Sequence, residues 1–181
     1  MAVLPALTTE RCTLESFNES HLSERYVSWL NDPEVVRFSV QRFRRHTVDS
    51  CRVYMESFRN TPHYFAAITA HDPALGHIGN INAYVDETNK IADVGIMVGE
   101  KRVWGKGYGV EAWMAMCQFL LVDLGLRKVT AGTVSANKGM LGIMRRANMR
   151  QDGVRYRHYL IEGLEVDLVY MALFREDLAA T

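Results

Sequence analysis

The sequence has few cysteines, no excess charge of either sign and no apolar run long enough to cross a membrane. Its 181 residues include three cysteines, Cys12, Cys51 and Cys117, which are widely separated and form no C-x-x-C pair. An odd, scattered set argues against a disulfide framework or a structural zinc site and is typical of a reducing compartment. Lys plus Arg and Asp plus Glu number 21 each. The formal charge is therefore zero, and no overall field attracts nucleic acid or an anionic membrane.

Signals for export and membrane insertion are also missing. The first ten residues contain no basic segment followed by a long apolar stretch, so we expect no signal peptide. The most apolar segment, residues 112–122, is shorter than the roughly 20 residues that a spanning helix needs. The composition predicts a soluble cytoplasmic protein with no metal, no nucleic-acid partner and no membrane partner. With 48% apolar residues and no linker or repeat, the chain suits a single domain over residues 1–181.

Helical and strand periodicities alternate along the chain. A proline at position 33 ends a first helix, and Thr47 is the expected N-cap of a second. The first half is predicted to contain a strand at 11–17, two helices, and strands at 63–70, 77–85 and 91–98; the apolar faces of the helices are Leu22, Tyr26, Trp29 and Leu30, and Val48, Cys51, Met55 and Phe58. A third helix follows and ends at Gly125, with Val110, Trp113, Met114, Cys117, Leu121 and Leu124 on one face. The rest is a strand at 128–134, a helix at 138–147, and strands at 154–161 and 164–174 joined by a turn at Glu162-Gly163.

This order predicts an α+β fold with a mixed, mostly antiparallel central sheet flanked by helices. Short strands separated by turn residues are typical of antiparallel pairing. Parallel pairing needs a crossover connection, and the sequence offers one only in the strand–loop–helix–strand unit centred on residues 105–109.

The most informative segment is the glycine-rich turn at residues 105–109. Gly105, Gly107 and Gly109 lie between a predicted strand and a helix, so free N–H groups at the positive end of the helix dipole form an anion site. Arg102 and Lys106 add cationic side chains. The spacing fits neither a P-loop nor a dinucleotide-binding motif. It does fit R-x-x-G-x-G, from Arg102 to Gly107.

This R-x-x-G-x-G motif resembles the acyl-CoA pyrophosphate motif of the GNAT superfamily of N-acyltransferases. The segment from Asn137 to Met149 is similar to the family's N-x-x-[AS]…Y-E-K-x-G-F helix, with several substitutions. Residues 7–14 and 153–176 resemble the branch named for ribosomal-protein N-terminal acetyltransferases. The similarity covers nearly the whole chain and implies the GNAT fold, with acetyl-CoA as the expected acyl donor.

The resemblance also implies the cofactor-binding residues. Backbone N–H groups of the turn would hold the pyrophosphate, and the strand before it would pair with the amides of the pantetheine arm through Ile96 and Val98. A backbone N–H near Met97 or Val98 would polarise the thioester carbonyl. Asn137 would hydrogen-bond the cofactor. The turn residues are Arg102, Val103, Gly105, Lys106, Gly107, Tyr108 and Gly109.

Candidate catalytic residues lie on the predicted strands. Asp93 occupies the strand position where several relatives have a Glu that acts as general base. The alternative is a strand-end carboxylate that makes a salt bridge or faces solvent. Asn80, Asn82 and Tyr84 share one strand face, which is either the acceptor cleft with a proton-shuttling water or a solvated face. His77 is more consistent with a structural role. Many relatives have a Tyr that protonates the departing thiol, and this position is Met144 here. The small residue that the family has three positions after the Asn is Met140. Candidates to replace the acid are Tyr156, Tyr159 and Ser135.

The acceptor is suggested by a basic segment, residues 37–46, in an otherwise neutral chain. Arg37 and Arg42, with Arg44 and Arg45, would bind a phosphate or carboxylate and repel a polyamine. The prediction is an N-acetyltransferase that acts by direct attack in a ternary complex on a small anionic amine such as an amino sugar. The alternatives are a protein N-terminal acetyltransferase and a non-catalytic CoA-binding module on the same fold. An edge strand in the final hairpin is compatible with a homodimer.

Overall fold

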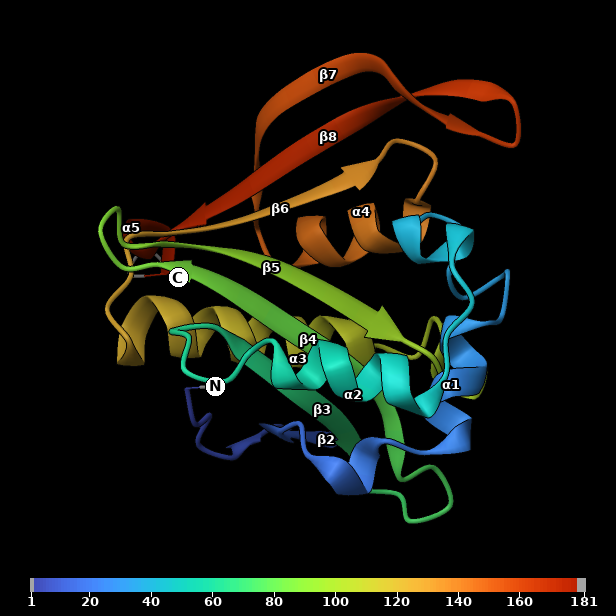
Figure 1. Ribbon diagram of the computed structural model, residues 1–181. Helices are drawn as coiled ribbons and strands as arrows, with labels where there is room; N and C mark the ends of the chain where they lie inside the picture. Colours follow the sequence, from blue (N-terminus) through green and yellow to red (C-terminus); the bar gives the residue numbers. More distant parts are fainter. Residues whose placement is uncertain (1, 179–181) are drawn as a thin grey trace.

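The computed structural model describes residues 2–178 and shows one twisted sheet with helices on both faces (Figure 1). Within these residues the strand order is β1-β2-β3-β4-β5-β6-β8-β7. The strands are β1 Leu7–Thr8, β2 Cys12–Ser16, β3 Tyr64–Ala70, β4 His77–Asp86, β5 Ile91–Val98, β6 Lys128–Val134, β7 Arg150–Ile161 and β8 Leu164–Phe174. The helices are α1 Glu24–Leu30, α2 Val48–Glu56, α3 Tyr108–Gln118, α4 Lys138–Arg146 and α5 Arg175–Leu178, with 3₁₀ turns η1 Glu19–His21, η2 Val40–Phe43 and η3 Lys101–Val103.

The predicted fold class is confirmed. Every strand pair is antiparallel except β5 with β6, which are joined through the glycine turn and α3 as expected. Strand β7 lies at one edge of the sheet, and the homodimer stays a prediction. No helix among residues 2–178 combines the length and the apolar character that crossing a bilayer requires.

Local chemistry explains several element boundaries. The Thr47 side chain accepts a hydrogen bond from the Ser50 N–H and caps α2, as predicted. Glu162 and Gly163 have φ angles of 52° and 80°, which suit the two-residue turn that matches the twist of a β-hairpin. Gly125 has a φ of 72° and follows the helix after α3, where a left-handed residue ends the helical hydrogen bonding.

Several local predictions were wrong. Leu22 precedes α1 rather than belonging to it, and β7 begins at Arg150 rather than at residue 154. The strand β1 was missed because two residues are too few to show a period. The predicted buried face of the third long helix was wrong at Met114 and Leu124, which are 51% and 40% exposed. Trp113, Cys117 and Leu121 are buried as predicted, and Met116 and Leu120 are buried beside them. After Gln118 the helix becomes a π-helix, in which the Leu124 N–H bonds the Phe119 carbonyl, and the wider turn rotates Leu124 away from the core.

The sheet separates two apolar cores. Residues of α3 and α4 pack on one face with β2–β6, whereas α1 and α2 pack on the other face against Phe65 and Ala67 of β3. In the view of Figure 1, α2 lies in front of the sheet and α3 behind it. Each strand therefore alternates between a face directed at α3 and α4 and a face directed at α1 and α2.

Strands β5 and β6 separate after three paired positions. Ile91, Ala92 and Asp93 pair with residues 128–130, and no pairing continues beyond them. By contrast, β4 pairs with β5 over eight positions. Figure 1 shows the two strands diverging toward their carboxyl ends. This separation leaves one side of β5 without a neighbouring strand, and it positions the site described next.

Candidate functional site

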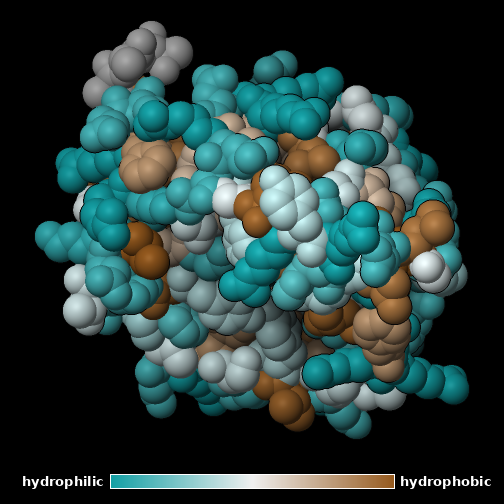
Figure 2. Space-filling model, turned by 90° about the horizontal axis from the view of Figure 1, so that it is seen from above, coloured by the Kyte–Doolittle hydropathy of each residue, from teal (hydrophilic) through white to brown (hydrophobic). Residues whose placement is uncertain are grey.

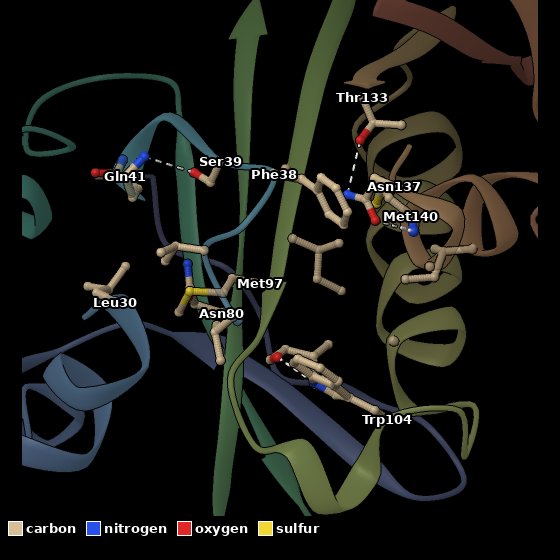
Figure 3. A pocket seen from close by; sticks show the side chains of 18 of the residues that line it. Leu30, Phe38, Ser39, Gln41, Asn80, Met97, Trp104, Thr133, Asn137 and Met140 are labelled. Carbon is tan, nitrogen blue, oxygen red and sulfur yellow. Dashed lines mark hydrogen bonds between the residues drawn. The ribbon is translucent and has the colours of Figure 1, made fainter. Parts of the chain in front are cut away.

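A single cleft of about 970 Å³ occupies the space where β5 and β6 separate. This volume is within the range of small-molecule and cofactor sites. One part of the cleft is lined by the glycine turn and α4, and the other by α1, α2 and the loop between them. Figure 3 shows residues from these elements around the same space, with Trp104 and Asn137 near one wall and Leu30, Ser39 and Asn80 near the other.

The glycine turn presents unpartnered backbone N–H groups. Gly105 and Gly107 have φ angles of 73° and 90°, which strongly favour glycine. Lys106 donates its N–H to the Val103 carbonyl, but the N–H groups of Gly105, Gly107, Tyr108 and Gly109 have no acceptor within the described residues. These N–H groups meet at the start of α3, where the helix dipole is positive. The turn is therefore suited to bind a phosphate.

The cationic side chains of this turn are directed elsewhere. Arg102 forms two hydrogen bonds with Glu100, at 2.8 and 3.1 Å. Hydrogen bonds from Arg102 and Arg25 hold the pKa of Glu100 at about 2. Neither Arg102 nor Lys106 lines the cleft, whereas Val103, Gly105, Gly107 and Gly109 do. Backbone groups, rather than the two predicted cationic side chains, thus face the space.

A cation that the sequence reasoning missed supports the turn from outside. Arg11 donates to Glu111 of α3 at 2.7 Å and to the Lys106 carbonyl. A Cβ on Gly107 would lie 2.7 Å from Arg11 Nη2. Arg11 belongs to the opening segment that carried the family resemblance, but nothing in that pattern shows that it contacts residues about 95 positions away.

The free edge of β5 has a defined hydrogen-bonding face. The carbonyls of Lys90, Ala92 and Val98 all accept hydrogen bonds from groups other than β4. Because backbone direction alternates along a strand, the N–H and C=O groups of Ile96 also face the separation. The predicted backbone pairing of Ile96 and Val98 with the cofactor would use this face of β5, and it stays a prediction. Trp104 donates its indole N–H to the Val98 carbonyl at 2.8 Å (Figure 3).

The same alternation bears on the predicted oxyanion donor. Met97 is paired with Asn80, and its carbonyl approaches Gly79 so closely that a Cβ there would lie 2.2 Å away. The backbone of Met97 thus faces β4, which leaves Val98 as the residue whose N–H points into the separation. Asn137 lines the cleft and caps α4, since its Oδ1 accepts the Met140 N–H at 3.1 Å.

The loop from α1 to α2 forms the other wall. The side chain of Asn31 fixes the end of this loop at His46. Its Oδ1 accepts the His46 N–H and its Nδ2 donates to the His46 carbonyl, each at 2.9 Å. Arg44, Arg45 and His46 line the cleft. Arg37 does not, because its guanidinium pairs with Glu162 at the tip of the β7–β8 hairpin, at 2.8 and 3.0 Å.

Arg42, the other predicted acceptor residue, is also outside the lining. It donates to the carbonyls of Ser39 and Leu160 and lies over the Phe43 ring. Asp32 and Glu34, which precede the basic loop in the sequence, are held by a residue from another segment. Both carboxylates bind Lys101, at 2.7 and 2.5 Å. Sequence proximity therefore identified the basic loop but not which of its arginines face the cleft.

The predicted catalytic residues are only partly brought together. Asn80 and Asn82 line the cleft, whereas Asp93 is exposed, accepts a hydrogen bond from Thr130 at 2.8 Å and does not line it. Tyr84 does not line the cleft but lies next to a residue that does. Its hydroxyl contacts that of Tyr54, a cleft residue, at 2.9 Å.

None of the acid candidates lines the cleft. Met144 belongs to α4, and its side chain is completely buried in the core. Tyr156 is 80% exposed on the β7–β8 hairpin, Tyr159 lies on the same strand, and the Ser135 hydroxyl accepts the Asp167 N–H. Among the described residues, no group of three His, Cys, Asp or Glu side chains is arranged to hold a metal ion.

His77 has the structural role that the sequence favoured. Its ring lies within 6 Å of the rings of Phe17, His21, Tyr26 and Trp29. Its Nε2 is 2.9 Å from the Gly79 carbonyl. Burial, together with the neighbouring His21, lowers the pKa of His77 to about 4, so the ring is neutral near pH 7.

Comparison with known proteins gives a consistent result. The family model described as an acetyltransferase (GNAT) domain matches residues 11–150. A RimL ribosomal L7/L12 α-N-protein acetyltransferase in complex with coenzyme A is 13% identical, with a TM-score of 0.81 over 94% of this chain and 98% of that one.

Two further solved structures are similar to the chain. The microcin C7 self-immunity acetyltransferase MccE, in complex with acetyl-CoA and AMP, is 17% identical, with a TM-score of 0.76 over 92% of this chain and 93% of that one. The spermidine N-acetyltransferase from Vibrio cholerae, in complex with CoA and spermine, is 13% identical, with a TM-score of 0.79 over 93% and 98%. At such identities these structures support the fold.

Proposed function

The chain belongs to the GNAT acetyltransferase family, and we propose that it transfers an acetyl group from acetyl-CoA to the primary amine of a small anionic acceptor, such as an amino sugar. The proposed reaction is a direct attack in a ternary complex. The amine forms the new N–C bond as the C–S bond of acetyl-CoA breaks, the amine nitrogen loses a proton to water, and the thiolate leaves.

One observation carries the proposal: a single cleft joins a phosphate-type site to a polar pocket through the separation between β5 and β6. The residues present fit CoA. The free N–H groups of the glycine turn would hold its pyrophosphate, and a Cβ on Gly105 would have nothing within 4 Å, so this part of the turn is open. The backbone of Ile96 and Val98 would align the pantetheine arm.

The charge of the second pocket favours an anionic acceptor. Arg44 and Arg45 line it and form no ion pair within the described residues, whereas the lining carboxylate, Glu34, is paired with Lys101. A polyamine would be repelled here, although spermine is bound in the Vibrio cholerae relative. The MccE structure contains AMP, an anionic nucleotide. Seen from above, the surface is mostly hydrophilic, with hydrophobic side chains in small separate groups (Figure 2).

Direct attack is favoured over a covalent enzyme intermediate. Cys51 is the cysteine in the cleft lining, and burial raises the pKa of its thiol, so it stays protonated and is a poor nucleophile. In this proposal the Val98 N–H would polarise the thioester carbonyl. Because Met144 is buried and apolar, the departing thiolate would take its proton from water, which a thiol pKa of about 8.5 permits.

The proposal is tested by isothermal titration of acetyl-CoA and CoA into the wild type and the Gly107→Trp variant, followed by a screen of amines read by thiol release. The screen compares glucosamine 6-phosphate, a nucleotide-linked amino sugar, spermidine and a peptide with a free N-terminus. Micromolar binding that the variant loses, with turnover of the anionic amines, supports the proposal. Turnover of the peptide alone supports an N-terminal acetyltransferase, and binding without turnover supports a non-catalytic module.

A further inference from the structure

Two side-chain amides on β4 stand in the cleft without hydrogen-bond partners. Asn80 and Asn82 both line it, and neither side chain makes a hydrogen bond within the described residues. Asn80 is only 8% exposed, and its Oδ1 is buried with no partner. Buried polar groups in folded proteins are nearly always hydrogen-bonded. An unpaired buried amide in a cleft therefore indicates a ligand that supplies the missing partner.

The surroundings of these amides offer no substitute. Across the strands, Asn80 lies between Ala67 and Met97, and Asn82 lies between Phe65 and Gly95. Ala67 and Phe65 are almost completely buried. These cross-strand neighbours are apolar or absent, and Asn80 is nearly buried, so a hydrogen bond between a ligand and its amide would be strong.

Gly95 places Asn82 at the point where β5 and β6 separate. A Cβ at Gly95 would lie 2.9 Å from Asn82 Oδ1, so the amide occupies space that any other residue would fill. Gly95 comes two residues after Asp93, the last residue of β5 paired with β6. On β6, Gly132 lines the cleft at the corresponding position, two residues after Thr130. Asn82 thus lies beside the passage that joins the two parts of the cleft.

We propose that Asn80 and Asn82, named here the carboxamide pair, hold the acceptor amine beside the separation of β5 and β6. This inference rests on the proposed function and adds how the amine is recognised. Residues two apart on a strand face the same side about 7 Å apart, so one amine between the two amides can donate an N–H to each oxygen. Amide oxygens are uncharged and stabilise an ammonium ion less than a carboxylate does. The bound amine therefore loses its proton to water more readily and becomes nucleophilic.

The test measures amine binding in the CoA complex. Glucosamine 6-phosphate is titrated into the CoA-saturated wild type and into the Asn80→Ala, Asn82→Ala and Gly95→Ala variants. We expect about tenfold weaker binding in the asparagine variants, as for the loss of a buried hydrogen bond. Gly95→Ala should also weaken binding, because its Cβ displaces Asn82. Gly153→Ala is the matched control, since a Cβ there has nothing within 4 Å and lies outside the cleft.

A second readout separates recognition from general damage. The Asn82→Asp variant should retain amine binding but move the midpoint of the kcat–pH profile upward, because a carboxylate stabilises the ammonium ion. Affinity for acetyl-CoA should be unchanged in every variant.

Two outcomes overturn the inference. If the wild type binds acetyl-CoA and acetylates the probe while Asn82→Ala keeps wild-type amine affinity, the carboxamide pair is not the amine site and the proposed function stands. If the CoA-saturated wild type binds neither this probe nor the nucleotide-linked amino sugar, or does not bind acetyl-CoA at all, the inference fails together with the proposed function.

Discussion

The aromatic cluster around His77 predicts that stability falls when the pH is lowered below neutrality. The pKa of His77 is lowered from 6.5 to about 4 in the folded protein, first by burial and then by the charge of His21. Between these values the unfolded chain binds a proton that the folded protein does not. The linkage relation therefore requires the free energy of unfolding to rise with pH in this window. The contribution is complete above about pH 6.5 and is lost progressively down to pH 4.

The expected magnitude follows from the size of the shift. A difference of 6.5 to about 4, at roughly 1.4 kcal/mol per unit, gives a total loss of about 3 kcal/mol. Of this, about 2 kcal/mol should be lost between pH 7.5 and pH 5. Urea unfolding followed by tryptophan fluorescence at these two pH values measures the change. Glu100, with its pKa held at about 2, contributes its pH dependence below this window.

Substitution assigns the effect to His77. His77→Phe keeps an aromatic ring and removes the titrating group, so the variant should lose about 2 kcal/mol of the pH dependence seen in the wild type. His158→Phe is the matched control, because His158 is exposed on β7. A wild type whose unfolding free energy is the same at pH 7.5 and pH 5, or a His77→Phe variant with the wild-type dependence, would refute the reasoning.

Three further predictions concern the cleft and its supports. Gly107→Ala places a Cβ at a φ of 90° and 2.7 Å from Arg11 Nη2, so unfolding in urea should show a loss of at least about 1–2 kcal/mol, and calorimetry a weaker affinity for CoA. Gly142→Ala, inside α4 with nothing within 4 Å of the new Cβ, should instead stabilise the protein by about 1 kcal/mol in the same urea assay. Met144→Tyr introduces the Tyr that acts as acid in many relatives. It should lower the free energy of unfolding by about 1–3 kcal/mol, because position 144 is fully buried and has no room for the larger ring. Its acetylation rate should not rise, and a faster thiol release would contradict the placement of Met144.

Much of the fold was predictable because it depends on local chemistry. The ends of β5, β6 and β8 were predicted to the residue from alternating patterns and turn residues. The caps at Thr47 and the turn at Glu162-Gly163 follow from the conformational preferences of single residues. The anion-binding character of residues 105–109 is likewise local, since it arises from consecutive backbone N–H groups at a helix start.

The site was less predictable, because side-chain partners are distant in sequence. Arg37, Arg42 and Arg102 were expected to bind ligands but are engaged by Glu162, backbone carbonyls and Glu100. Arg44 and Arg45, a few residues away, face the cleft. Composition identifies a basic segment, but only the packing of the loop against the β7–β8 hairpin selects which cations remain available.

The sequence by itself determined the order of helices and strands, the mixed sheet and the phosphate-type turn, because these depend on periodicity and on single-residue backbone preferences. Only the tertiary structure decided that β5 and β6 pair over three positions and then separate. It also decided that Gly95 brings Asn82 beside that separation and that Met144 is enclosed in the core. These features depend on contacts between segments far apart in the chain, for which no single stretch of sequence carries a signal.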